Sequence, residues 1–214
     1  MSLNLLELKN NSEKCNKLVF ILHGYGADGN DLISLASHWQ RFLPDYYFCA
    51  PNAPNVCQVS ATGFEWFDLM QTDLNQIKEE TLISLDKLNL SIKEKLEILN
   101  LTNKDLILVG FSQGTMMSIQ YAASQKEPIS GVLGYSGRIY DEQLFLEKLN
   151  SKTKIKLLHG NSDEIVPVEE MYKTVDFLKK QKFDIDYNVY EGLGHSISPE
   201  GLSEGLAFLQ KLNT

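Results

Sequence analysis

Residues 105–123 read Asp105-Leu-Ile-Leu-Val-Gly-Phe-Ser-Gln-Gly-Thr-Met-Met-Ser-Ile-Gln-Tyr-Ala-Ala123. This stretch gives the clearest indication of the fold. Its first six residues are an apolar run of strand length, and residues 115–123 have the composition of a helix. Between them, Gly110-Phe111-Ser112-Gln113-Gly114 matches Gly-x-Ser-x-Gly, the pattern of a sharp strand-to-helix turn that exposes a serine hydroxyl. The pattern predicts that Ser112 is a nucleophile.

Two alternatives to this interpretation remain at the level of sequence. Ser112 would be a simple helix cap if the glycines served only the turn. Ser136, in Gly134-Tyr-Ser-Gly137, resembles a second nucleophile motif, but Arg138 stands where the second glycine is required. The helix-cap alternative leaves the acid and base motifs described below unexplained.

Apolar runs of strand length alternate along the chain with helix-length amphipathic segments. This alternation predicts an α/β protein with a mostly parallel central sheet and helices on both faces. The expected strands are Leu18–Leu22, Tyr46–Ala50, Leu106–Val109, Gly131–Tyr135, Ile155–Leu158 and Ile185–Tyr190, with Leu3–Leu8 as a further edge strand. The expected helices are Asp31–Leu43, Leu74–Leu99, Thr115–Ala123, Val168–Gln181 and Glu200–Leu212. We expect residues 1–214 to form a single domain.

Composition excludes several classes of function. The net charge of −8 disfavours binding to nucleic acid, which depends on clustered Lys and Arg. Residues 1–17 lack the apolar stretch of a secretory signal, and no apolar run reaches the length of about 18 residues that a membrane span needs. Cys15, Cys49 and Cys57 are odd in number and lack zinc-site spacing, which predicts reduced thiols, no metal site and a cytoplasmic protein.

A serine nucleophile needs an imidazole base and a carboxylate that orients the imidazole. In chains with such a turn the order is serine, acid, histidine. His195 lies on a glycine-containing loop after the last expected strand, and Asp163 follows the strand Ile155–Leu158. We therefore expect Ser112, Asp163 and His195 to act together, with His159 and Glu164 as the alternative base and acid.

The negative charge of a tetrahedral intermediate requires two backbone N–H donors. Gln113, directly after the nucleophile, is expected to give one, and Tyr25, in the loop after an early strand, the other. We expect His23 to hold this loop by side-chain hydrogen bonds rather than to take part in chemistry.

The same loop also matches a dinucleotide-binding pattern through Gly24, Gly26 and Gly29. That interpretation requires an acidic residue at the end of the second strand, where the sequence has Pro51-Asn52 instead. Dinucleotide binding is therefore the weaker hypothesis.

Seven motifs in order resemble the phospholipase/carboxylesterase family of small α/β-hydrolases, which includes acyl-protein thioesterases and lysophospholipases. They are Leu22-His-Gly-Tyr-Gly-Ala-Asp28, Ala50-Pro-Asn-Ala-Pro54, Glu65-Trp-Phe-Asp68, Gly110-Phe-Ser-Gln-Gly114, Tyr135-Ser-Gly137, His159-Gly-Asn-Ser-Asp163 with Val166-Pro167, and Gly192-Leu-Gly-His195. The resemblance implies an α/β-hydrolase fold without a large cap domain, and a Ser112-Asp163-His195 triad with Tyr25 and Gln113 as oxyanion donors. It also implies cleavage of small acyl esters, lysolipids or acyl-protein thioesters without metal or organic cofactor.

Residues 51–72 lack clear periodicity, and a long irregular segment of this kind in a compact domain is often functional. We expect it near the active site, with Phe64, Trp66, Leu69 and Met70 lining an acyl pocket. These side chains would equally suit a small core under the loop, peripheral contact with a membrane, or a homodimer interface. A non-catalytic acyl-binding or interaction protein on the same scaffold is the alternative function.

Overall fold

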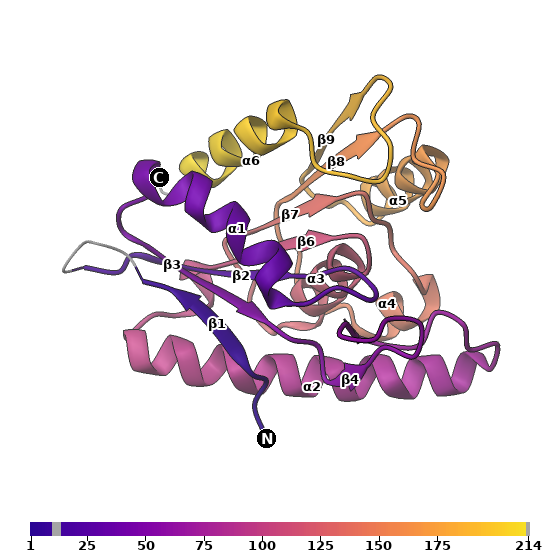
Figure 1. Ribbon diagram of the computed structural model, residues 1–214, viewed down its shortest axis with the longest axis horizontal. Coiled ribbons are helices and arrows are strands. Elements are labelled where there is room, and N and C mark those ends of the chain that lie inside the picture. Colours follow the sequence, from indigo (N-terminus) through magenta and orange to yellow (C-terminus); the bar gives the residue numbers. More distant parts are fainter. Residues whose placement is uncertain (10–13, 213–214) are drawn as a thin grey trace.

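A computed structural model describes residues 1–9 and 14–212 of the chain (Figure 1). Its central sheet has seven strands in the order β1-β3-β2-β6-β7-β8-β9. The strands are β1 (Leu5–Leu8), β2 (Lys17–Leu22), β3 (Tyr46–Pro51), β6 (Leu106–Phe111), β7 (Gly131–Tyr135), β8 (Ile155–Gly160) and β9 (Ile185–Tyr190). Neighbouring strands are parallel except β1, which pairs antiparallel with β3 at one edge. The predicted mostly parallel sheet is confirmed, including its additional edge strand.

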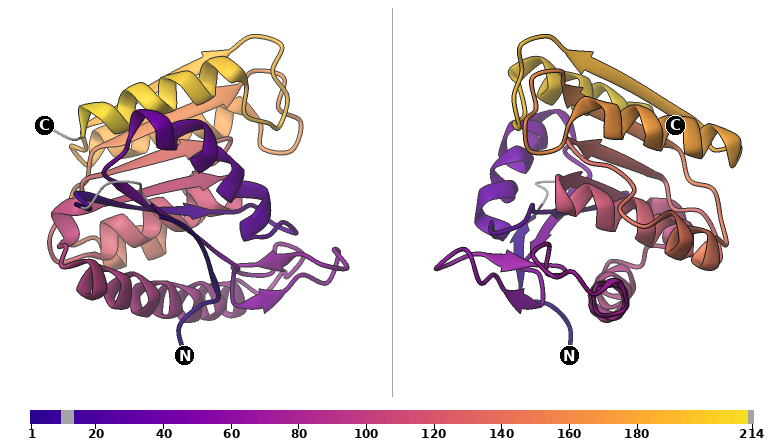
Figure 2. Two further views of the ribbon diagram at one scale, coloured as in Figure 1. Left: turned by 60° about the vertical axis from the view of Figure 1, so that its left-hand side comes forward. Right: turned by 90° about the vertical axis from the view of Figure 1, so that its right-hand side faces the viewer.

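Helices cover both faces of this sheet. They are α1 (Gly29–Trp39), α2 (Leu74–Leu99), α3 (Gln113–Ser124), α4 (Glu142–Lys148), α5 (Val168–Lys180) and α6 (Pro199–Lys211), with short 3₁₀ turns at Gln40–Phe42 and Asn103–Asp105. Figure 2 shows α1 and α6 on one side of the sheet and α2, α3 and α5 on the other. Because helices cover both faces of the sheet, the side chains on both faces of the central strands must be apolar.

Strand β2 shows how the sequence meets this requirement. Leu18, Phe20 and Leu22 belong to the core under α2 and α3, whereas Val19 and Ile21 belong to the core under α1 and α6. All five side chains are fully buried. Successive side chains of a strand point to opposite faces, so a continuous apolar run fills both cores at once.

The helices begin at residues that satisfy their free N–H groups. The carboxylate of Asp28 accepts from Asn30 and Asp31 at the start of α1, and the hydroxyl of Ser198 accepts from Gly201 at the start of α6. Pro199, in the first turn of α6, has no backbone N–H group. This does not weaken the helix, because the first N–H groups of a helix have no acceptor within it. The helix predicted over Glu200–Leu212 is present in the structure as α6.

Two features of the fold depart from the sequence prediction. Residues 51–72 are not wholly irregular, because β4 (Asn55–Val56) and β5 (Phe64–Glu65) form an antiparallel pair within them. The seven-residue helix α4 was not predicted. Two-residue strands and a helix of two turns are too short to produce a periodic pattern that stands out in a sequence.

Within residues 1–9 and 14–212, no helix is long and apolar enough to cross a membrane. Cys15, Cys49 and Cys57 are free thiols. Burial raises the pKa of the Cys49 thiol, which keeps it protonated and unreactive.

Helix α2 offers a matched test of the packing. Ile92 is fully buried against the sheet, whereas Ile98 on the same helix is 73% exposed. Replacing Ile92 with Ala should lower the free energy of unfolding by about 2–5 kcal/mol, because the lost side chain leaves a cavity. Ile98→Ala should change it by less than about 0.5 kcal/mol. Urea unfolding of both variants measures the difference, and equal effects would contradict the packing described.

Candidate active site

Ser112 lies at a strained turn between β6, which ends at Phe111, and α3, which begins at Gln113. Its φ and ψ are 53° and −116°, a region that non-glycine residues rarely adopt. The turn packs tightly against β2, since a Cβ on Gly114 would lie 1.9 Å from the carbonyl oxygen of Leu22. The N–H of Ser112 donates to the carbonyl of Tyr135 at 2.9 Å, which fixes the serine against β7. The structure thus has the sharp turn that the sequence predicts.

Asp163 and His195 follow the carboxyl ends of β8 and β9 and meet beside this turn. The Nδ1 atom of His195 lies 2.8 Å from Oδ2 of Asp163. The other carboxylate oxygen accepts from the N–H groups of Ile165, at 3.0 Å, and Val166, at 2.8 Å. The imidazole also packs on the ring of Phe111, with centroids 4.8 Å apart. Asp163 is 5% exposed, so it meets His195 in a largely dry environment.

These hydrogen bonds decide the charge of Asp163. Burial raises the pKa of the carboxyl, but hydrogen bonds from His195, Val166 and Ile165, together with the charge of His195, outweigh burial and lower the pKa below its usual value. Asp163 is therefore ionised at neutral pH and holds the Nδ1 proton of His195. The Nε2 lone pair is left available as a base.

His159, the alternative base, contacts the acid instead. Its Nε2 atom lies 2.7 Å from the carbonyl oxygen of Val166 and 3.3 Å from Oδ2 of Asp163. A carbonyl only accepts, so Nε2 carries the proton, and burial lowers the pKa of the ring. His159 therefore braces the loop that bears Asp163. In the sequence, this role is indicated by the position of His159 at the end of a strand, four residues before Asp163.

The expected oxyanion donors occupy the two loops next to the nucleophile. Gln113 is the first residue of α3, and the first N–H groups of a helix have no partner within the helix. Gly24 and Tyr25 lie in the loop after β2, where a Cβ on Gly24 would be 3.3 Å from the Cβ of Ser112. Both loops thus reach the serine, as two converging N–H donors require.

Residues 64–67 hold these two loops together, a role that sequence reasoning missed. Phe64 exchanges backbone hydrogen bonds with Gly26 and Ala27, at 3.0 and 2.8 Å. The side chain of Gln113 accepts from the N–H of Trp66 at 3.0 Å and donates to the carbonyl of Phe67 at 2.7 Å. One short segment therefore fixes the position of both expected donors.

The loop after β2 is further secured by His23, which is fully buried. Its Nε2 atom accepts from the N–H of Ala53 at 2.9 Å, and its Nδ1 atom lies 2.7 Å from the carbonyl of Gly24. The carbonyl of His23 accepts from the indole N–H of Trp66 at 3.0 Å. These contacts join the loop after β2 to Ala53 and Trp66 and give His23 a structural role.

An open pocket lies beside the turn between β6 and α3, and Ser112 and His195 both line it. Its other lining residues are mostly apolar: Gly24, Tyr25, Ala27, Leu69, Met70, Phe111, Met116, Arg138, Tyr140, Ile165, Val166, Pro167 and Glu170. Of the four expected acyl-pocket residues, the structure brings Leu69 and Met70 to this pocket. It does not bring Trp66, which is fully buried beneath the loop, or Phe64, which packs against the core.

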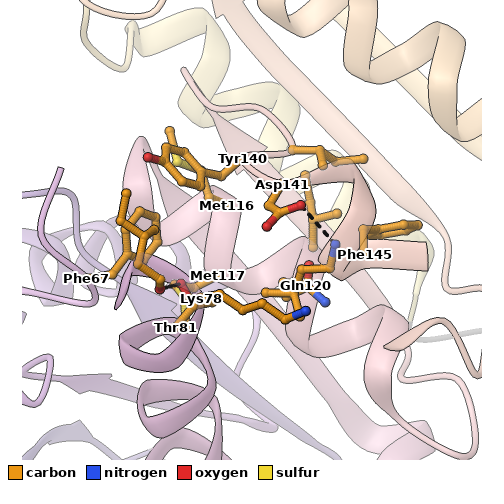
Figure 3. Close-up of a pocket in the computed structure, with 13 residues that line it drawn as sticks. Phe67, Lys78, Thr81, Met116, Met117, Gln120, Tyr140, Asp141 and Phe145 are labelled. Atoms are coloured by element: carbon orange, nitrogen blue, oxygen red, sulfur yellow. Dashed lines mark hydrogen bonds between the residues drawn. The ribbon is translucent and has the colours of Figure 1, made fainter. Parts of the chain in front are cut away.

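A narrower crevice lies next to the pocket, between α2, α3 and α4 (Figure 3). Met116 and Tyr140 line both spaces. Figure 3 shows these two side chains at one side of the crevice and Gln120 away from them, near Phe145. Met116 and Gln120 follow Ser112 at spacings of four and eight residues, so one face of α3 leads from Ser112 into the crevice.

Comparison with known proteins identifies the family of this chain. The model of the phospholipase/carboxylesterase family matches residues 3–213, and the chain belongs to that family. Acyl-protein thioesterase 1 of Gibberella zeae is 28% identical over 90% of this chain and 89% of its own length. Acyl-protein thioesterase 1 of Saccharomyces cerevisiae is 25% identical over 98% of each chain.

Solved structures give the same result. The crystal structure of esterase PE8 superposes with a TM-score of 0.92 and 33% identity, covering 99% of this chain and 100% of that one. Arabidopsis thaliana SOBER1, at 20% identity and a TM-score of 0.82, covers 92% of this chain and 99% of its own, and shares the fold. These matches confirm the predicted family, the α/β-hydrolase fold and the class of serine ester hydrolase. The family model covers Gly24, Gly26 and Gly29, so the loop that contains them is part of the phospholipase/carboxylesterase domain.

Replacing Asp163 with Asn should lower kcat by about 10⁴-fold, because an amide cannot hold the productive tautomer of the imidazole. Glu164→Gln is the matched control, since Glu164 is the exposed neighbour and the alternative acid. It should leave kcat within about twofold. Steady-state hydrolysis of a p-nitrophenyl ester measures both, and the reverse order of effects would assign the acid to Glu164.

The buried His159 should make stability depend on pH. Its pKa is lowered in the folded protein, so below the unfolded value of about 6.5 the unfolded chain binds more protons. The free energy of unfolding should therefore fall as pH drops from 7.5 to 5.5. His159→Gln should make this dependence shallower, by up to about 1.4 kcal/mol per pH unit.

The exposed His38 provides the control for this experiment. His38→Gln should leave the pH dependence of the unfolding free energy as in the unsubstituted protein. Urea unfolding across the pH range measures all three proteins. An unchanged slope in His159→Gln would contradict the role given to burial.

Proposed function

We propose that this enzyme hydrolyses carboxylic esters or thioesters of acyl chains through a covalent acyl-enzyme at Ser112. The observation that carries the proposal is the 2.8 Å contact between His195 and an ionised, buried Asp163, beside a serine held at a φ of 53°. A paired imidazole next to a strained, pocket-lining serine is the arrangement that activates a hydroxyl as a nucleophile.

In the first half of the reaction, Nε2 of His195 takes the proton from Oγ of Ser112 as this oxygen attacks the acyl carbonyl. The carbonyl oxygen becomes negatively charged and accepts from the N–H groups of Tyr25 and Gln113. His195 then gives its proton to the leaving alcohol or thiol as the tetrahedral intermediate collapses. Asp163 stabilises the imidazolium throughout and remains ionised.

The second half of the reaction repeats these steps with water. His195 takes a proton from a water molecule, whose oxygen attacks the acyl-enzyme, and the same N–H groups hold the new oxyanion. Collapse releases the carboxylic acid and returns the proton to Ser112. These residues complete both halves without a metal or organic cofactor.

The pocket supports acyl chains as substrates. Leu69, Met70, Met116 and Ile165 give it apolar walls, which suit a hydrocarbon chain. Met70 and Ile165 are 66% and 71% exposed at its rim, so the site would admit a substrate larger than the pocket, such as a lysolipid or an acyl-protein. The three free cysteines suit a cytoplasmic setting for this activity.

Replacing Ser112 with Ala should lower kcat for both esters and thioesters by more than about 10³-fold, since no other group would form the acyl-enzyme. Ser136→Ala is the matched control, because Ser136 is also buried and also has a positive φ, of 46°. It should retain most of the activity. Turnover of p-nitrophenyl esters and acyl thioesters measures both variants, and near-normal turnover by Ser112→Ala would end the proposal.

Labelling with a fluorophosphonate separates catalysis from simple acyl binding. Only an activated serine reacts with this probe, so the unsubstituted protein should be labelled and Ser112→Ala should not. Mass spectrometry of the intact protein measures the adduct. A folded protein that resists the probe would favour the non-catalytic alternative.

A further inference from the structure

Arg138 places a cation in an otherwise mostly apolar pocket. Among the described residues that line the pocket, only Arg138 and Glu170 carry a formal charge besides His195. Arg138 follows directly on backbone that touches the nucleophile, because a Cβ on Gly137 would lie 2.8 Å from the carbonyl oxygen of Ser112. A charged side chain weakens the binding of a neutral acyl chain, because the chain removes water from the charge without replacing its hydrogen bonds. A cation in this pocket is better explained by a substrate that carries a negative charge.

The surroundings of Arg138 hold its side chain but leave hydrogen-bonding capacity. Its guanidinium carbon lies 5.1 Å from the centroid of the Tyr140 ring, and Nη1 donates to the carbonyl of Ile139 at 3.3 Å. The same nitrogen lies 3.6 Å from Oε2 of Glu170, which is longer than a hydrogen bond. A guanidinium has five N–H donors, so these contacts leave donors for another acceptor.

Glu170 does not fully neutralise this cation. Its other carboxylate oxygen lies 2.6 Å from Nζ of Lys173, and that hydrogen bond lowers the pKa of Glu170. One carboxylate is thus shared between two cations, and the closer contact is with Lys173. The three side chains together carry a charge of +1; Arg138 and Glu170 line the pocket, and Lys173 lies outside it.

The groove on the other side of Arg138 contains further charged side chains, of which Asp141 and Lys78 have partners of their own. The carboxylate of Asp141 accepts from the N–H of Leu144 at 2.9 Å and caps α4. Lys78 lies 2.6 Å from Glu147. Glu142 also lines this groove and is the first residue of α4. Glu170 is therefore the carboxylate that shares the active-site pocket with Arg138.

We propose that Arg138 binds an anionic group of the substrate, a carboxylate or a phosphate, beyond the scissile bond. The planar guanidinium matches either group with two parallel hydrogen bonds. The inference rests on the proposed function and narrows it: among esters of equal size, those with a negative charge within reach of Arg138 are the better substrates.

The test compares two pairs of esters that differ in one charge. Mono-p-nitrophenyl glutarate and p-nitrophenyl pentanoate place the difference in the acyl group. Esters of butyric acid with 4-hydroxybenzoate and with 4-hydroxybenzamide place it in the leaving group. The measured quantity is the ratio of kcat/KM for the charged ester to that for the neutral ester, and the pair that responds to Arg138 identifies the side on which the anion binds.

Arg138→Gln should lower this ratio about tenfold for one pair, the size expected for loss of one charge-assisted hydrogen bond. Glu170→Gln should raise the ratio, because it removes the carboxylate that competes for Arg138. Raising the salt concentration should lower the ratio in the unsubstituted enzyme. Lys154→Gln removes the same charge near the start of β8, at the opposite end of the strands, and should leave the ratio unchanged.

A ratio within twofold of the original in Arg138→Gln, for both pairs, would overturn the inference. So would an equal fall of the ratio in Arg138→Gln and Glu170→Gln, since the ion pair would then only support the loop. Thermal unfolding checks each variant; should Arg138→Gln fail to fold, Glu170→Gln and Arg138→Lys provide the same comparison. Loss of the proposed function gives a different result, the absence of Ser112-dependent turnover of the neutral esters.

Discussion

The turn from β6 into α3 passes so close to β2 that a side chain at Gly114 would collide with the carbonyl of Leu22. This close approach holds Ser112 at a positive φ and places it where the loops after β2, β7, β8 and β9 converge. Ser112 is thus positioned by backbone packing of the central strands. Strain of this kind persists only where the surrounding structure enforces it.

Hydrogen bonds hold the other parts of the site in place around this turn. Residues 64–67 link the loop after β2 to Gln113, while His159 and two backbone N–H groups fix Asp163. His195 completes the arrangement through its contact with the acid. Preorganisation of this kind lowers the energy required to reach the charged transition state, because the donors need not reorient during the reaction.

Sequence reasoning predicts the parts of this protein that have a strong local signal. The apolar runs of the parallel sheet, the glycines of the turn at Ser112, and the order of Asp163 and His195 all follow from residue types and spacing. Helix α4 and the pair β4–β5 give no such signal because they are too short for a periodic pattern. Their existence depends on contacts with segments far away in the sequence.

The pocket is harder to predict than the pairing of Asp163 with His195, for the same reason. Trp66 and Met70 are both large, apolar and only four residues apart, yet Trp66 is fully buried and Met70 is 66% exposed. What separates them is the bond from the indole N–H of Trp66 to the carbonyl of His23, a contact between segments 43 residues apart. Arg138 likewise drew attention only as the residue that breaks a glycine motif, and its place in the pocket emerges from the fold.

Trapping the acyl-enzyme would show directly which residue forms the covalent intermediate. The enzyme would be mixed with a p-nitrophenyl ester, quenched with acid within the first turnover, digested and mapped by mass spectrometry. The acyl group should be found on the peptide that contains Ser112, in up to one equivalent per chain. An acyl group on another residue, such as Ser136, or rapid turnover with no covalent adduct at any quench time, would show that the reaction does not pass through an acyl-enzyme at Ser112.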